Sequence, residues 1–327
     1  MKTDKYGIPL IRCRTAKGFL TQLDELHDRW ARSTWIFRGQ NDASRALYPK
    51  AMRKDGLIAR LVKERLDKYT DRTLVTNDAA KQCCLQMDDD EFRERVWHAL
   101  HVSIEKKVVG AFTELADQSR LDVPTDTLGK VGGSRWPLER LVSHYVNKAC
   151  LYEIEHYPRS IIYALAQHHG IPTRLMDWTF RSMVAAFFAA YEFNLSRCSS
   201  NGKVPTHMAV WAVRWPDLGR SGLLRLTHQR NLIGNLQAQE GLFLYNPLAD
   251  KDRPSRHSWL NFDHLLETIV QFEAVYKITL PFSQRHEVLE LLARLGYRRP
   301  YLMPTFDNVA DEFISGRLDP IEFHERH

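Results

Sequence analysis

Hydrophobic residues recur along this chain at two spacings, one typical of helices and one typical of strands. Residues 15–30 carry apolar side chains three and four positions apart, which predicts a helix with Thr15 as its N-cap. The following run, Trp35-Ile36-Phe37, is aromatic and β-branched, and it predicts a buried strand that ends at Arg38-Gly39. The first part of the chain therefore indicates a helix that leads into the core of a sheet.

Period-two alternation returns in the second half of the chain. It predicts strands at residues 207–215, 241–245 and 274–280, followed by a helix at residues 285–295 that Gly296 ends. Together these segments predict a mixed α/β (α+β) fold, in which helices surround a small central sheet of mostly short strands.

Residues 56–147 are mostly helical in pattern and rich in charge. The acidic run Asp88-Asp89-Asp90-Glu91 favours the start of a helix, because negative charge at that end is favourable to the helix dipole. We expect one domain over residues 1–327, with a charged helical insertion at about residues 56–150.

Two further predicted helices enclose a polar segment. The first, residues 155–168, is stopped by Gly170-Ile171-Pro172, and the second runs to residue 193 from a cap at Asp177 or Thr179. Apolar residues cover all sides of the second helix, which predicts a position at the centre of the core.

Composition and charge narrow the class of protein. The chain has 327 residues, of which 44% are hydrophobic, and a net charge of +6, which fits a globular protein with a sizeable core. Five cysteines without metal-ligand spacing indicate reduced thiols, and the chain start lacks a signal-peptide pattern. No apolar run approaches the roughly 20 residues that a bilayer requires, so we expect a cytoplasmic protein with no membrane partner and no metal. The charge fits either an ordinary basic surface or a polyanionic ligand.

The first candidate site segment is Phe37-Arg38-Gly39-Gln40. An arginine at the end of an apolar strand is costly to bury without an anionic partner, and its planar fork suits a phosphate or a carboxylate. Gly39 lets a ligand or a neighbouring backbone approach closely. The alternative is an internal ion pair between Arg38 and Asp177.

The second candidate segment, residues 167–179, lies between the two predicted helices, where binding residues are common. Adjacent His168 and His169 diverge in direction, which argues against a shared metal. Asp177 has the alternative of capping a helix, and Arg174 that of a structural salt bridge. The candidate binding residues of this segment are His168, Thr173, Arg174, Trp178 and Thr179.

The third candidate segment places Gln239 and Glu240 directly before a predicted strand. Their side chains can bind ribose hydroxyls or cap the neighbouring backbone. The chain has no P-loop, no dinucleotide-binding glycine pattern, no Gly-x-Ser-x-Gly elbow and no zinc-binding Cys/His spacing.

These segments, in this order, resemble the FRG domain, a bacterial and phage family named for its Phe-Arg-Gly motif. The matching pieces are Trp35-Ile36-Phe37-Arg38-Gly39-Gln40, Leu47-Tyr48-Pro49 with Arg53, residues 167–179, and Gln239 with Gly241-Leu242-Phe243. The resemblance extends from about Phe19 to Ile314.

The strand-borne Phe37-Arg38-Gly39 also resembles, more loosely, the arginine segment of ADP-ribosyltransferases. This second likeness implies a related fold, NAD as a substrate, and three catalytic residues: Arg38 to hold the phosphates, Asp177 to order the site, and Glu240 to assist transfer. The chain departs from that group because residues 173–179 lack a Ser-Thr-Ser pattern.

The resemblances therefore imply an NAD-dependent, ADP-ribosyltransferase-like toxin or phage-defence effector whose acceptor is a protein or a nucleic acid. Gly39, Gln40, Thr173 and Gln239 would help to bind the substrate. Two alternatives stay open. One is a nucleotide- or nucleic-acid-binding module without catalysis, and the other is a structural or partner-binding protein.

Overall fold

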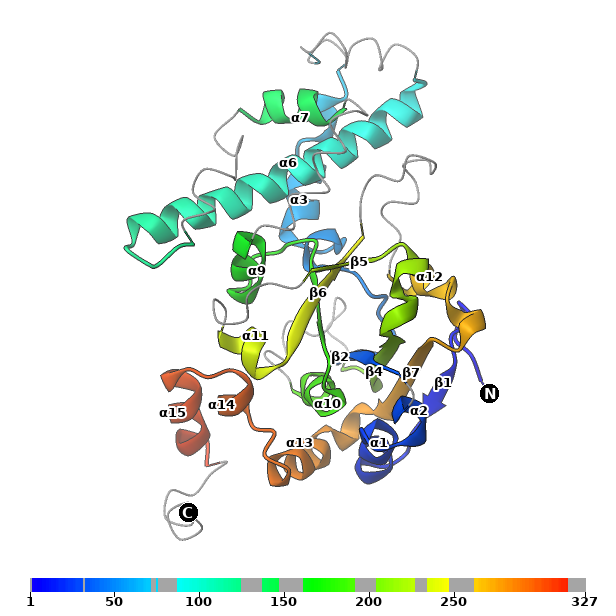
Figure 1. The fold of residues 1–327 in the computed structure, drawn as a ribbon. Coiled ribbons are helices and arrows are strands. Elements are labelled where there is room, and N and C mark those ends of the chain that lie inside the picture. The colour runs from blue at the N-terminus through cyan, green and yellow to red at the C-terminus, as the bar shows by residue number, and fades with distance from the viewer. Residues whose placement is uncertain are drawn as a thin grey trace.

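The computed structural model describes residues 2–31, 33–71, 75, 87–124, 137–146, 161–191, 204–226, 234–246 and 262–316. A seven-stranded sheet lies at its centre, and helices cover the sheet (Figure 1). The predicted mixed α/β class is confirmed. No helix in these described ranges is long and apolar enough to cross a membrane.

The strands follow the order β1-β7-β4-β2-β3-β6-β5, in which β1 pairs with β7 in parallel and every other pair is antiparallel. Their bounds are β1 (Leu10–Arg12), β2 (Trp35–Gln40), β3 (Met176–Thr179), β4 (His207–Arg214), β5 (Leu224–Leu226), β6 (Gly241–Tyr245) and β7 (Val275–Pro281). The sheet therefore joins segments from both ends of the chain around β2.

One face of the sheet packs on three helices, α1 (Ala16–Leu23), α10 (Ser182–Ala190) and α13 (Arg285–Arg294). Trp35 and Phe37 point into this core, and Gly39 follows on the same face by strand alternation. A Cβ at Gly39 would lie 2.1 Å from the carbonyl oxygen of Ala185 in α10. The glycine is therefore required by the close approach of the α10 backbone.

The opposite face carries Ile36, Trp178 and Trp211, which pack against α12 (Phe262–Glu267) and its neighbours. Arg38 lies between Phe37 and Gly39, so alternation directs its side chain to this face and away from α10. The predicted central helix is confirmed in α10, and Arg38 is not sealed beneath it.

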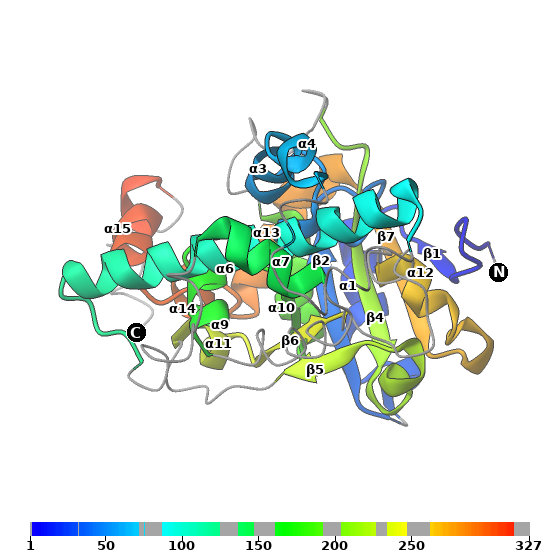
Figure 2. The same cartoon turned by 90° about the horizontal axis from the view of Figure 1, so that it is seen from above.

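A group of helices lies above the sheet in Figure 1. In Figure 2, which is seen from above, the longest helix of this group crosses in front of the sheet. The members of the group are α3 (Leu57–Lys63), α4 (Leu66–Tyr69), α6 (Asp89–Gln118) and α7 (Leu138–Val146), which share an apolar cluster of their own. Asp88 caps α6 by accepting a hydrogen bond from the Glu91 backbone N–H at 2.7 Å, as the acidic run predicts. Helix α9 (Ile161–His168) lies between α6 and the sheet (Figure 1).

The remaining helices are short and mostly lie at the periphery. They are α2 (Asp28–Ala31), α11 (Gly234–Ala238), α14 (Arg299–Leu302) and α15 (Phe306–Ile314), with 3₁₀ turns at Lys50–Met52, Trp215–Ser221, Val270–Phe272 and Phe282–Gln284.

The cap predicted for α10 is wrong. Helix α10 begins at Ser182 after Arg181, whereas Asp177 and Thr179 lie in strand β3. The mixed polar pattern of residues 176–179 conceals this strand, because Asp177 is exposed while its neighbours are buried. The first part of the helix predicted at residues 155–168, residues 155–160, lies outside the described residues.

Candidate functional site

The two central strands β2 and β3 separate close to Arg38. Their ladder contains one residue pair, Phe37 with Thr179, whereas β2 pairs with β4 over six positions. Beyond that pair, the carbonyl of Asp177 accepts a hydrogen bond from Nη1 of Arg38 at 2.5 Å. The arginine side chain therefore occupies a position that backbone pairing would fill in a continuous ladder.

Arg38 forms only a long ion pair with the Asp177 carboxylate. Nη1 lies 3.9 Å from Oδ2, and the Asp177 side chain is 58% exposed while that of Arg38 is 18% exposed. Nε of Arg38 is buried and has no hydrogen-bond partner within the described part of the chain. A bidentate pair would have two contacts below 3 Å, so Asp177 does not saturate this guanidinium.

Lys50 and Arg53 join Arg38 in what we call the Arg38 cluster (Arg38, Lys50 and Arg53). Both follow the loop after β2, and the Ala51 backbone N–H donates to the carbonyl of Thr173 at 3.1 Å, which fixes this turn beside the approach to β3. Neither Lys50 nor Arg53 forms an ion pair with any described residue.

The electrostatics of the Arg38 cluster are those of surplus positive charge. Burial lowers the pKa of Arg38 to about 10, while Asp177 acts to raise it and Arg53 lowers it further. Burial also lowers the pKa of Lys50, against the attraction of Asp177 and with repulsion from Arg53 and Arg38. The pKa of Arg53 is lowered by burial and by Arg45, while Asp55 and Asp177 act to raise it. The charges are thus close enough to repel one another, and Arg38 remains protonated at neutral pH.

The carboxylate of Asp177 is held from its other side. Gln167 donates from Nε2 to Oδ1 of Asp177 at 2.8 Å, and the Thr173 hydroxyl donates to Oε1 of Gln167. The hydroxyl engages the carbonyl oxygen of the amide, so the NH₂ group faces the carboxylate. Thr173 and Gln167 thereby fix the orientation of Asp177.

His168 ends α9 near Asp177 and Lys50, and it reaches solvent although surrounding protein desolvates its ring in part. Burial and the neighbouring His169 lower its pKa, Asp177 acts to raise it, and Lys50 lowers it further. The predicted residues Arg38, Thr173, Asp177 and His168 are therefore brought together.

Arg174 forms a buried salt bridge within the protein. Its Nε and Nη2 donate to Oε2 of Glu105 at 2.8 and 2.6 Å, and its backbone N–H donates to Oε1 at 2.8 Å. The two side chains are 7% and 1% exposed. The structural salt bridge considered for Arg174 is thus present, and it attaches helix α6 to the segment that carries Thr173.

Four other predicted residues make contacts within the protein. Gln40 donates from Nε2 to the Arg45 carbonyl and accepts from the Trp211 indole, both at 2.9 Å. Thr179 donates to the Gln239 carbonyl at 2.6 Å, and Gln239 donates from Nε2 to the Leu302 carbonyl at 2.9 Å. Trp178 is buried in the core opposite α10.

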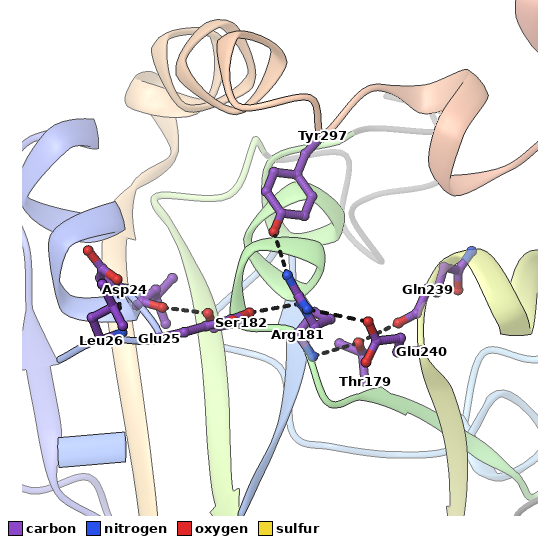
Figure 3. Close-up of polar contacts among 10 residues, drawn as sticks. Asp24, Glu25, Leu26, Thr179, Arg181, Ser182, Gln239, Glu240 and Tyr297 are labelled. Carbon is purple, nitrogen blue, oxygen red and sulfur yellow. Dashed lines mark hydrogen bonds and ion pairs between the residues drawn. The ribbon is translucent and has the colours of Figure 1, made fainter. Parts of the chain in front are cut away.

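Glu240 lies in a second polar group, the Arg181 clasp (Arg181, Glu25, Glu240 and Tyr297), shown in Figure 3. Arg181 is 2.9 Å from the Glu25 carboxylate and 3.4 Å from that of Glu240, and it donates to the Tyr297 hydroxyl at 3.3 Å. The hydrogen bond to Tyr297 and the two carboxylates raise the pKa of Arg181.

The Arg181 clasp and the Arg38 cluster lie toward opposite ends of β3. The Glu240 carbonyl accepts from the Phe180 backbone N–H at 3.2 Å, just beyond the strand end. Phe180 is three residues from Asp177, which corresponds to about 10 Å along a strand. The structure therefore brings Arg38 and Asp177 together and holds Glu240 in a separate ion pair.

Sequence reasoning did not identify Lys50, Gln167, Glu105 or Arg181 as members of these groups. Lys50 and Arg53 carry a usable signal, because they follow Pro49 in the loop after the arginine-bearing strand. Glu105 and Arg181 carry none, since their partners are distant in sequence. Within the described ranges, no group of three or more His, Cys, Asp or Glu residues could hold a metal ion.

Comparison with known proteins gives a match to one family model over part of the chain. The family model described as the FRG domain matches residues 116–197. The match covers the segment with Gln167, Thr173 and Asp177, whereas Phe37-Arg38-Gly39 precedes it. No curated protein and no solved structure matches the chain.

Proposed function

We propose that this chain, of which residues 116–197 match the FRG domain, binds a phosphate-bearing nucleotide through the Arg38 cluster. NAD is the nucleotide that the likeness to ADP-ribosyltransferases favours. Arg38 and Arg53 supply planar forks for phosphate oxygens, and Lys50 supplies a point charge.

The observation that carries this proposal is the charge balance at the β2–β3 separation. Among the described residues, the three cations face only two carboxylates, namely Asp55, which attracts Arg53, and the largely exposed Asp177, whose closest approach to Arg38 is 3.9 Å. Cations held together in a low-dielectric setting repel one another, and a bound anion relieves that repulsion. Surrounding protein desolvates the Lys50 ammonium in part, but the residue still reaches solvent and leaves the group accessible.

A second candidate function is ADP-ribosyl transfer from NAD, and the orientation of Asp177 favours it. An acceptor nucleophile would form a bond to C1′ of the nicotinamide ribose, and neutral nicotinamide would leave with the electron pair of the broken C–N bond. The acceptor proton would pass to solvent. Asp177 would stabilise positive charge that develops on the ribose, and a role for Glu240 would require release from Arg181. A cytoplasmic toxin or phage-defence role follows from the same likeness.

Titration calorimetry with ADP and NAD tests the binding proposal. Arg38→Ala removes a charge-assisted contact worth about 1.5–3 kcal/mol, so affinity should fall roughly 10- to 100-fold. The matched control is Arg181→Ala, which removes a half-exposed arginine beside other carboxylates and should leave affinity within about twofold.

Absence of binding by the unaltered protein at millimolar ADP and NAD would refute the proposal, as would equal losses in the two variants. A nucleic-acid site would instead favour single-stranded RNA or DNA over ADP, and binding would weaken steeply with salt. Release of nicotinamide from NAD, abolished by Asp177→Ala and retained in Glu240→Gln, would support the transfer reaction with Asp177 as the acting carboxylate.

A further inference from the structure

The Asp177 carboxylate is unfavourable for a site that only binds an anion. Its charge lies 3.9 Å from Arg38, where it repels any phosphate that approaches the guanidinium. It also remains largely exposed and makes no close ion pair with the guanidinium, so it offsets the charge of Arg38 only in part. Its position therefore calls for a ligand group that a carboxylate attracts.

The contacts of Asp177 determine which group that is. An ionised carboxylate only accepts hydrogen bonds, and one of its oxygens, Oδ1, is engaged by Gln167. Thr173 engages the other end of the Gln167 amide. The free capacity of Asp177 is directed toward solvent beside Arg38, so it needs a ligand that carries a hydrogen-bond donor next to a phosphate.

Ribonucleotides carry that combination, because ribose hydroxyls lie on the sugar to which the phosphate is attached. We propose that Asp177 accepts a hydrogen bond from a ribose hydroxyl of the nucleotide whose phosphates bind the Arg38 cluster, and that Gln167 is the residue that positions it. This inference rests on the proposed function. It makes Asp177 a selector for ribonucleotides, since a deoxy sugar leaves the carboxylate without a donor.

The same geometry predicts which nucleotides are rejected. A phosphate on the recognised hydroxyl would place two negative groups in contact beside Gln167, an uncharged partner of Asp177. Asp177 therefore separates nucleotides with free ribose hydroxyls from those phosphorylated at that position.

The test compares four probes by titration calorimetry: ADP, 2′-deoxy-ADP, 3′-deoxy-ADP and inorganic pyrophosphate. The unaltered protein should bind ADP about 10- to 100-fold more tightly than at least one deoxy analogue, as expected for a hydrogen bond to a charged group. Asp177→Ala should reduce this ratio to within about twofold. Pyrophosphate has no hydroxyl, so it should bind Asp177→Ala at least as tightly as the unaltered protein.

Gln167→Met provides a second variant that leaves the carboxylate in place. It should lower the ADP to deoxy-ADP ratio while pyrophosphate affinity stays within about twofold, an effect that a general loss of folding would not produce. Equal affinity for ADP and both deoxy analogues, together with Arg38-dependent pyrophosphate binding, would overturn this inference and leave the proposed function standing. Failure of pyrophosphate and ADP alike to bind would overturn both.

Discussion

Two arginines near opposite ends of β3 differ in their surroundings. In the described part of the chain, cations outnumber carboxylates around Arg38, whereas carboxylates outnumber cations around Arg181. Arg38 shares the exposed Asp177 carboxylate with Lys50 and Arg53, of which Arg53 is also attracted by Asp55, whereas Arg181 contacts two carboxylates, those of Glu25 and Glu240. Tyr297 adds a hydroxyl to the second group. In the proposed function, charge balance, rather than the presence of an arginine beside an acid, distinguishes the ligand site from an internal contact.

A third arginine, Arg174, is a reference for a fully paired internal contact. Its removal should have the largest effect on the free energy of unfolding. Arg174 is fully paired with Glu105 in the core, and its removal leaves a buried carboxylate without its cation. Arg174→Ala should lower the free energy of unfolding by about 3–5 kcal/mol in urea titration. Glu105→Gln serves as the partner in a double-mutant cycle, and a loss below about 1 kcal/mol for Arg174→Ala would contradict the assigned structural role.

Arg38 should behave in the opposite way from Arg174. Arg38→Met removes one of three mutually repelling cations and keeps an apolar stem, so the free energy of unfolding should stay within about 1 kcal/mol or rise. Nucleotide affinity should fall at least tenfold in the same variant. A large loss of stability in urea titration would show that Arg38 is an internal contact like Arg174.

The pH dependence of anion binding should identify Lys50. Burial lowers the pKa of Lys50 below its ordinary value of 10.5, so this ammonium loses its proton as the pH rises through that lowered value. Because the anion requires the protonated form, pyrophosphate affinity should be full near neutrality and fall as the pH rises through the lowered pKa of Lys50, below its ordinary value. In Lys50→Arg, the fall in pyrophosphate affinity should occur at higher pH, since arginine keeps its proton at a pH where lysine loses it. An unchanged pH profile in Lys50→Arg would exclude Lys50 from the site.

The smallest effects are expected in the Arg181 clasp. Its three charged side chains are 39–44% exposed, and solvent screens ion pairs at such positions. Arg181→Met and Glu240→Gln should each lower the free energy of unfolding by less than about 1 kcal/mol and leave ADP affinity within about twofold. A tenfold loss of ADP affinity in either variant would indicate that the nucleotide binds at the Arg181 clasp rather than at the Arg38 cluster.

Much of the architecture follows from local patterns. Strand β2, the buried helix α10, strands β4, β6 and β7, and the Asp88 cap were predictable, because apolar period and capping residues act over a few positions. Strand β3 was missed, since Asp177 interrupts its apolar pattern. Strands β1 and β5 have three residues each, too few to show a period.

The candidate site was predictable only in part, because local patterns identify single residues and not their partners across the fold. The Phe37-Arg38-Gly39 run and residues 167–179 identify Arg38, Thr173 and Asp177 because their polar residues lie next to apolar runs. Pairings across the fold cannot be read in this way, so Glu240 was grouped with Arg38 although it contacts Arg181. Gly39 likewise required the structure, because its neighbour turned out to be the backbone of α10.

The most direct test of the central claim is a crystal structure of the protein with ADP bound. The account predicts the diphosphate within hydrogen-bond distance of Arg38 and at least one of Lys50 and Arg53, with a ribose hydroxyl on Asp177. Diphosphate bound to Arg181, with Glu240 displaced from its ion pair, would contradict the account.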